Sequence, residues 1–280
     1  GTHTLSLSDC EETACVWEFD RRPIFYRIIR KPGCPEQKEY NPKSPYKLMN
    51  NHTLQIIRQL NKQQIVNLYF CPKFHACLDT QEDIEYILDA PETVAVKIQG
   101  IASFTTPADV PIWFVSLLKK RDIPLFVHTD YRRTCVSNSN PTLTYLVSEN
   151  NALNWSMFGL KHDLRILLAH GLRLCPSTTQ IVNAYENFCV GLGPDYALNI
   201  ERSNNCLEAE YLPTLFETVD LKKICFSTDY AWNIFNRGVW DVRDWSSIDR
   251  VVKTMLQLQL SASIEDVLSQ NAKRFFKLKR

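Results

Sequence analysis

The chain has 280 residues, 45% of them apolar, so it is long enough to bury one large core. Its 32 basic and 31 acidic residues give a formal charge of +1, and this balance provides no field that would attract nucleic acid. No stretch reaches the roughly 20 continuous apolar residues of a membrane helix, and residues 1–10 lack the pattern of a signal peptide. Ten cysteines are scattered through a chain too large to need dense disulfides. We therefore predict a soluble, cytoplasmic protein with mostly reduced cysteines.

The N-terminal region has the weakest secondary-structure pattern of the chain. Two short apolar runs, residues 4–8 and 23–29, are candidates for strands, and the polar stretch 9–20 between them is compatible with a helix. The segment 30–46 contains four prolines and a glycine. Because proline interrupts helices, this composition predicts a long ordered loop.

From about residue 65 onward, short apolar runs alternate with longer amphipathic segments. The candidate strands are residues 65–71, 93–99, 124–129, 165–170, 196–201 and 223–228. The candidate helices are residues 80–88, 107–120, 178–188, 206–218, 245–259 and 263–276. The segment 134–160 reads as a long insertion that covers a pocket. This alternation is typical of parallel strands joined by helical crossovers. Together with two N-terminal strands it predicts an α/β fold, a (βα)8 TIM barrel distorted in its N-terminal strands, with residues 1–280 as one domain.

Three of the predicted strands end in, or are directly followed by, a residue that could bind a metal. These residues are His128, His170 and Asp229. In a barrel the carboxyl ends of all strands meet at one mouth, so we expect the three side chains to converge there. Imidazole and carboxylate groups are the ligands that catalytic zinc and related metals take. The sequence therefore predicts a metal site at this mouth.

The order and local context of five short motifs resemble the amidohydrolase-2 branch of the amidohydrolase superfamily, over about residues 60–278. The motifs are Val96-Lys97-Ile98, Val127-His128-Thr129, Ala169-His170-Gly171, the run from Thr228 to Trp232, and the run from Asn271 to Phe276. The resemblance implies a metal-dependent hydrolase or decarboxylase built on a TIM barrel.

The resemblance to this branch implies a metal site with three sources of ligands. They are a His-x-His pair on the first strand, the His that ends the fifth strand and the Asp that ends the eighth. His128 and Asp229 match the last two roles, and His170 lies near the substrate or a second metal. His3 supplies one first-strand His, but Leu5 stands where the second would be. One divalent metal ion is expected. Zinc is favoured, and iron or manganese would accept the same ligands.

The resemblance also implies roles in the reaction on a small-molecule substrate. The metal would lower the pKa of a bound water and polarise the substrate, Asp229 would carry the proton to the leaving group, and His170 would stabilise the developing oxyanion. Three further residues are candidates for substrate binding. These are Lys97, whose ammonium is costly at the end of an apolar strand unless it faces a polar mouth; Arg132, next to Arg133; and Trp232 as a pocket wall.

Three functions follow as alternatives. The first is hydrolysis of a carbon–nitrogen or carbon–oxygen bond of a small molecule, and the second is decarboxylation of an aromatic or unsaturated acid, with Lys97 or Arg132 on its carboxylate. The third is a barrel without catalysis that serves as a binding subunit, which the departure at Leu5 motivates. A homo-oligomer is compatible with all three. The run Cys71-x3-His75-x-Cys77 is an alternative metal cluster, although its spacing fits no common zinc motif.

Overall fold

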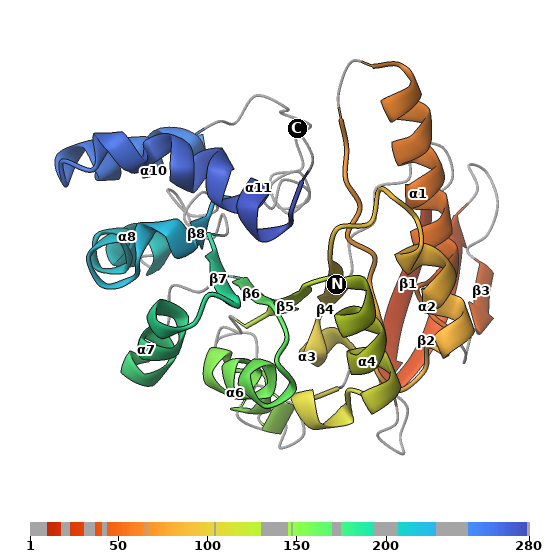
Figure 1. Cartoon of the computed structure of the whole chain (residues 1–280). Helices are drawn as coiled ribbons and strands as arrows, with labels where there is room; N and C mark the ends of the chain where they lie inside the picture. The colour runs from red at the N-terminus through yellow and green to blue at the C-terminus, as the bar shows by residue number, and fades with distance from the viewer. Residues whose placement is uncertain are drawn as a thin grey trace. The chain divides into compact units, whose positions relative to one another are not determined.

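A computed structural model of the chain is shown in Figure 1. It describes residues 10–17, 23–30, 37–40, 44–64, 67–103, 105–129, 145–146, 148–169, 175–192, 207–227 and 246–278. The chain divides into two compact units. The first comprises Gly1–Val127 and Arg133–Asn150, and the second comprises His128–Arg132 and Asn151–Arg280. The predicted single domain stays a prediction.

The first unit begins with an antiparallel sheet of three strands in the order β1-β2-β3. The strands are β1 (Cys10–Trp17), β2 (Pro23–Arg30) and β3 (Gln37–Tyr40). Trp17 pairs with Pro23, so only residues 18–22 connect the first two strands. A parallel crossover needs a dozen or more residues, whereas an antiparallel hairpin needs only a few. This short connection explains why β2 does not pair as a parallel barrel strand.

Three predictions for the N-terminal region are thereby corrected. The predicted helix at 9–20 is wrong, because β1 occupies most of it. The predicted strand at 23–29 exists as β2, but it is antiparallel to its neighbours. The predicted loop at 30–46 contains β3, and the next helix begins one residue beyond it. The predicted strand at 4–8 lies outside the described residues.

The remainder of the first unit alternates helices with parallel strand segments. Its elements are α1 (Lys47–Lys62), α2 (Gln81–Leu88), β4 (Val96–Ile98), α3 (Gly100–Ser103), a 3-10 turn (Pro107–Asp109), α4 (Ile112–Arg121) and β5 (Leu125–His128). β4 and β5 pair in parallel. Single parallel bridges, Phe70↔Thr93 and Lys73↔Lys97, place the segment before α2 beside the segment that contains β4.

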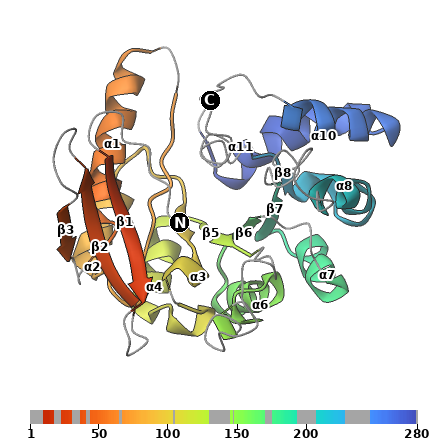
Figure 2. The ribbon, with the colours of Figure 1, turned by 180° about the vertical axis from the view of Figure 1, so that it is seen from behind.

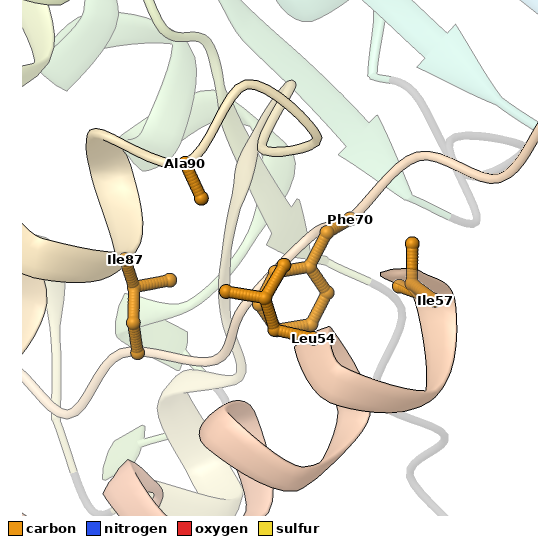
Figure 3. Close-up of a cluster of buried hydrophobic side chains, with 5 residues drawn as sticks. All are labelled: Leu54, Ile57, Phe70, Ile87 and Ala90. Atoms are coloured by element: carbon orange, nitrogen blue, oxygen red, sulfur yellow. The ribbon is translucent and has the colours of Figure 1, made fainter. Parts of the chain in front are cut away.

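A buried apolar cluster fixes α1 and α2 against this segment (Figure 3). Leu54 and Ile57 from α1 meet Phe70, Ile87 from α2 and Ala90, and the exposed fraction of each is at most 8%. The N-cap residue of α2 is Thr80, whose hydroxyl accepts a hydrogen bond from the backbone N–H of Asp83. The side chain of Asp83 reaches back to the N–H of Thr80, which completes a capping box. Burial of one face and capping of the first turn together fix this helix.

The second unit carries the regular βα repeat. Its elements are α6 (Ala152–His162), β6 (Ile166–Ala169), α7 (Pro176–Ala184), β7 (Phe188–Gly191), α8 (Leu207–Thr218), a 3-10 turn (Leu221–Lys223), β8 (Ile224–Cys225), α10 (Ser246–Gln257), a 3-10 turn (Ser261–Ser263), a π-helical turn (Asp266–Gln270) and α11 (Asn271–Phe275). The strands pair in parallel in the order β6-β7-β8. α6 packs against β6 and α7 against β7, as the view from behind also shows (Figure 2).

The close approach of α6 to the neighbouring strands explains why residue 159 of this helix is a glycine. A Cβ atom at Gly159 would lie 2.8 Å from both Ile166 Cδ1 and Phe188 Cε1. Trp155 in the same helix is fully buried, and all four residues of β6 and of β7 are buried as well. Strands buried on both faces read as continuous apolar runs, which is why β6 was predictable.

Most predicted strands and helices after residue 65 are confirmed, whereas β7, α6 and the short helix α3 were missed. β4, β5, β6 and β8 lie within the predicted strands at 93–99, 124–129, 165–170 and 223–228, whereas 65–71 contributes a single bridge and 196–201 lies outside the described residues. β7 was missed because the predicted helix at 178–188 was extended into it. α6 occupies the end of the predicted insertion at 134–160, and Pro111 separates the predicted helix at 107–120 into two pieces.

No helix in the described part of the chain is long and apolar enough to span a membrane. Cys71, Cys77, Cys175, Cys189 and Cys225, whose side chains are described, are free thiols.

Candidate functional site

Two of the seven predicted site residues, Lys97 and His128, lie within the described residues. The other five lie outside them. These are His3, Arg132, His170, Asp229 and Trp232. The strands that precede the last three in the sequence, β6 and β8, are described up to their ends.

His128 is the last residue of β5, and the burial of that strand alternates along its length. Leu125 and Val127 are fully buried, whereas Phe126 and His128 are half-buried. Successive side chains of a strand point to opposite faces, so Phe126 and His128 share the less covered face. A half-buried imidazole at a strand end is a position from which a metal ligand can act.

The end of β5 is joined to the end of β6 by a side-chain hydrogen bond. The hydroxyl of Thr129, the residue after His128, donates to the backbone oxygen of Ala169 at 2.7 Å. Ala169 is the last residue of β6 and directly precedes His170 in the sequence. Two of the strand ends that carry predicted ligands are therefore side by side.

The ends of β6, β7 and β8 continue this alignment within the second unit. Ala169 pairs with Gly191, and Gly191 pairs with Cys225, so the last residues of three strands stand in register. The backbone N–H of Leu192, just beyond β7, donates to the oxygen of Cys225 at 2.8 Å. Cys225 precedes Asp229 by four residues in the sequence. Three neighbouring strands of the second unit therefore end at the same edge.

Lys97 lies in the middle of β4 in the first unit, between the buried residues Val96 and Ile98. It pairs with Phe126 on β5, and its ammonium nitrogen is 3.6 Å from the centroid of the Phe126 ring. A cation over an aromatic face is attracted by the ring quadrupole. This contact gives the lysine head group a defined position beside the Phe126 ring.

Cys71, His75 and Cys77 do not form the alternative metal cluster. Within the described ranges, no three His, Cys, Asp or Glu side chains are arranged so that they could hold a metal ion. The Nδ1 atom of His75 accepts a hydrogen bond from the backbone N–H of Cys77, and burial lowers the pKa of His75 to about 4. Burial raises the pKa of the Cys71 thiol to about 12. The segment is therefore a neutral, internally bonded turn.

Asp79 closes this turn and is the buried carboxyl group with the most perturbed environment in the described chain. Its Oδ2 atom accepts from the backbone N–H of His75 at 2.7 Å, while no described residue bonds its buried Oδ1 atom. Burial raises the pKa of Asp79 from 3.8 to about 7, against the opposing effect of the His75 hydrogen bond. Between about pH 4 and pH 7 the carboxyl group is therefore protonated in the folded chain and ionised in the unfolded chain.

Asp79→Asn is expected to remove a pH dependence of stability. The unfolded chain releases this proton near pH 4 and the folded chain near pH 7, so between these values the folded state binds more protons and stability falls as the pH rises. The free energy of unfolding of the variant, relative to that of the parent, should rise by up to about 4 kcal/mol between pH 4 and pH 8. This is the free energy that corresponds to moving a pKa from 3.8 to about 7. Urea unfolding of the parent and the variant at both pH values measures this difference in the free energy of unfolding. A difference between variant and parent that does not change with pH would contradict this account.

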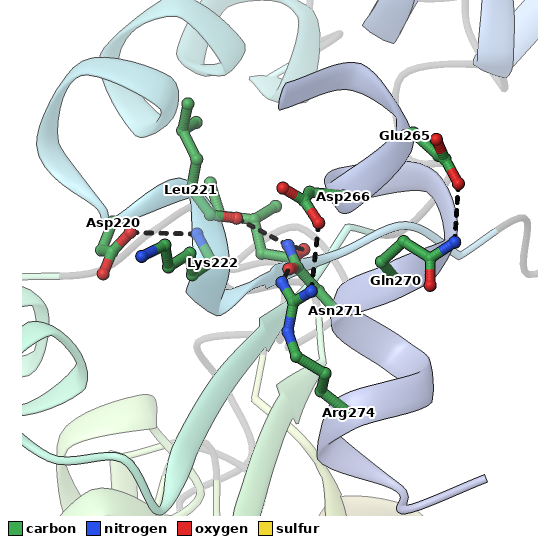
Figure 4. Close-up of polar contacts among 9 residues, drawn as sticks. Asp220, Leu221, Lys222, Glu265, Asp266, Gln270, Asn271 and Arg274 are labelled. Carbon is green, nitrogen blue, oxygen red and sulfur yellow. Dashed lines mark hydrogen bonds and ion pairs between the residues drawn. The ribbon is translucent and has the colours of Figure 1, made fainter. Parts of the chain in front are cut away.

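Asn271 is a residue whose role the sequence alone did not reveal (Figure 4). Only 1% of it is exposed, and its Nδ2 atom donates to the backbone oxygens of Leu221 and Ile224, both at 2.6 Å. Its Oδ1 atom accepts from Arg274, which also pairs with Asp266 at 3.1 Å. The motif from Asn271 to Phe276 therefore ties the last helix to the start of β8. A buried amide with partners at both ends indicates a structural role for it.

The comparisons with known proteins place the fold. No protein-family model and no curated protein matches the chain. Among solved structures, an amidohydrolase II is similar, with a TM-score of 0.54 and 11% identity over 86% of this chain and 80% of that chain. A proposed metal-dependent hydrolase from Lactobacillus casei ATCC 334 matches 61% of this chain and 43% of its own, with 12% identity and a TM-score of 0.38, too low to carry an argument.

The similarity to the amidohydrolase II structure establishes the architecture. The chain has an α/β fold of the (βα)8 TIM-barrel type, and the predicted resemblance to the amidohydrolases is confirmed at the level of the fold. In this fold active sites lie at the carboxyl ends of the strands. The strands β5, β6, β7 and β8 end at His128, Ala169, Gly191 and Cys225, respectively.

Proposed function

We propose that the chain is a metal-dependent hydrolase that cleaves a carbon–nitrogen or carbon–oxygen bond of a small molecule. The observation that carries this proposal is the Thr129–Ala169 hydrogen bond, which puts the strand end bearing His128 beside the strand end that leads to His170. The barrel fold, shared with an amidohydrolase II structure, supports it. Shared folds do not imply shared chemistry, so the strand-end residues carry the argument.

In the proposed site one divalent metal would be held by His128, Asp229 and His170, with His3 as the first-strand ligand. Zinc fits imidazole and carboxylate ligands, and iron or manganese would accept the same set. The half-buried position of His128 at the end of β5 fits a ligand of this kind. When bound, the metal supplies a nucleophile at neutral pH and polarises the group under attack.

The protein side chains transfer the proton, stabilise the developing charge and bind the substrate. Asp229 takes a proton and passes it to the leaving group, and His170 donates to the oxygen on which negative charge develops. Lys97, Arg132 and Trp232 bind the substrate. Of these, Lys97 is supported by the defined position of its ammonium over the Phe126 ring.

Decarboxylation of an aromatic or unsaturated acid is the second candidate. The contact between the Lys97 ammonium and the Phe126 ring favours it, because a cation beside an aromatic surface suits a carboxylate on a planar group. The two reactions share the metal and differ in the bond that breaks.

A substrate screen tests the proposal. Purified protein, with zinc, iron or manganese added in turn, is incubated with panels of amides, esters, lactones and aromatic acids. We expect hydrolysis products from one of the first three panels, and loss of the activity with a chelator. Release of carbon dioxide without hydrolysis would instead identify the decarboxylase. Absence of both reactions with every metal would favour the binding subunit.

A further inference from the structure

Two buried thiols lie on neighbouring strands of the second unit. Cys189 is in β7 and Cys225 ends β8, and both are free thiols with only 4% and 3% of each residue exposed. Gly191 pairs with Cys225, and Cys189 lies two residues before Gly191 on the same strand. Side chains of paired residues, and of residues two apart on a strand, project from the same face. The two thiols therefore share one face as diagonal neighbours.

The face that carries the thiols is the inner face of the barrel. The opposite face is covered by α6, because a Cβ atom at Gly159 of that helix would lie 2.8 Å from Ile166 Cδ1 and from Phe188 Cε1. Cys189 follows Phe188, and successive side chains of a strand point to opposite faces. In a βα barrel the helices surround the strands, so the face away from α6 is the inner one. Both thiols therefore occupy positions that bulky branched side chains usually fill.

The side chains of Cys189 and Cys225 are hydrogen-bonded to each other. This hydrogen bond and burial raise the pKa of the Cys225 thiol well above its usual value, and the positive charge of Arg274 opposes the shift. Cys225 is therefore a neutral thiol at neutral pH. A metal ion that binds it has to displace its proton, because the thiolate is the form that binds metals.

The spacing of the two cysteines does not fit a disulfide. Neighbouring strands lie about 4.8 Å apart and a strand rises about 3.3 Å per residue, so diagonal neighbours have Cα atoms about 8 Å apart. A disulfide requires Cα atoms within about 7 Å, and this pair could form one only if the backbone moved. An ion between the two sulfur atoms spans a longer distance than an S–S bond. The diagonal arrangement therefore favours a bridging ion.

The number and type of ligands decide which ion suits this pair. Among the residues that the structure describes, no three His, Cys, Asp or Glu side chains are arranged so that they could hold a metal. Zinc in structural sites takes four ligands, so two thiols do not satisfy it. Cuprous ion is soft, prefers thiolates, and accepts two of them in a near-linear arrangement. One Cu(I) with two thiolates carries a net negative charge, which the positive charge of Arg274 near Cys225 offsets.

We propose that Cys189 and Cys225 form a two-coordinate binding site for cuprous ion inside the barrel. Binding forms two Cu–S bonds and releases the two thiol protons, and no electron is transferred. The bound ion links β7 to β8 and stabilises the folded chain, since the unfolded chain does not hold the two thiols together. This site is independent of the proposed hydrolase reaction, whose metal is assigned to His and Asp side chains.

Competition for Cu(I) with the coloured cuprous complex of bicinchoninate, without air and with ascorbate as the reductant, tests the site in the full chain. We expect the parent to remove one equivalent of Cu(I) from the complex. Cys189→Ala and Cys225→Ala should each bind the first equivalent at least about a hundredfold more weakly, because one thiolate remains in place of two. Cys77→Ala and Cys175→Ala, which change exposed cysteines, are the matched controls and should bind it as the parent does.

Equal affinity for the first equivalent in the parent and in both of these variants, with folding verified by circular dichroism, would overturn the site. X-ray absorption at the copper edge of the parent with one equivalent of Cu(I) requires no variant. Two sulfur neighbours are expected, and nitrogen neighbours or a third sulfur would contradict the proposal. Zinc binding should be equal in the parent and in both variants, and its loss in either would overturn the choice of Cu(I). The hydrolase metal depends on His128 and Asp229 instead, so failure of one proposal leaves the other standing.

Discussion

Replacing Asn271 with alanine is expected to lower the free energy of unfolding by about 2 to 4 kcal/mol, because two buried backbone oxygens lose their donor. Those oxygens belong to Leu221, in the turn before β8, and to Ile224, the first residue of β8. Arg274 would also lose an acceptor. The urea concentration at the midpoint of unfolding should fall while the slope of the transition stays the same.

Gln270→Ala is the matched control for this change. Gln270 precedes Asn271 in the chain and bonds only the exposed side chain of Glu265 among the hydrogen bonds drawn in Figure 4. This substitution should lower the free energy of unfolding by less than about 1 kcal/mol, as is usual for polar contacts near the surface. Equal destabilisation by the two changes would contradict the role of Asn271 as the tie between the last helix and β8.

Replacing His128 with alanine is expected to reduce turnover of the substrate found by screening at least about a hundredfold, since a lost ligand weakens metal binding and misplaces the metal. His128 is half-buried at the end of its strand, so the fold should persist. Steady-state kinetics over a range of added metal measure the loss. Excess metal should restore part of the activity.

His52→Ala serves as the control for His128→Ala. His52 is an exposed residue of α1, where alanine favours the helix. We expect unchanged turnover in this variant. Turnover by His128→Ala that equals that of His52→Ala at limiting metal would show that His128 is not a ligand.

Sequence reasoning succeeded where burial leaves a pattern in the chain itself. β6 is a short run of buried residues and β5 alternates buried with half-buried ones, and short apolar runs of this kind can be recognised without knowledge of neighbours. β7 has the same character, but α7 ends at Ala184 and leaves only three residues before Phe188. A helical period that runs so close to a strand hides the boundary between them.

The pairing of distant residues could not be read from the sequence. Lys73 follows Pro72 in a segment with no regular strand, and only the bridge to Lys97 reveals that the two lysines are neighbours. The antiparallel pairing of β1 and β2 likewise follows from the short connection at residues 18–22, which a search for parallel strands overlooks. Asn271 is similar, because its partners lie about fifty residues earlier in the chain.

The candidate site was predictable as far as strand ends could be placed. A barrel brings the carboxyl ends of its strands to one edge, and the Thr129–Ala169 contact agrees with that expectation. The ligand roles of His3, His170 and Asp229 stay predictions, as do the roles of Arg132 and Trp232. Loop conformations determine such positions, and a pattern of apolar residues does not specify them.

Elemental analysis of the purified protein tests the central claim most directly, beside a variant carrying both His128→Ala and Asp229→Ala that circular dichroism shows to be folded. The proposed site predicts close to one equivalent of zinc, iron or manganese in the parent and its loss in the variant. A folded parent that holds no metal and takes up none of the three when they are added would contradict the metal site.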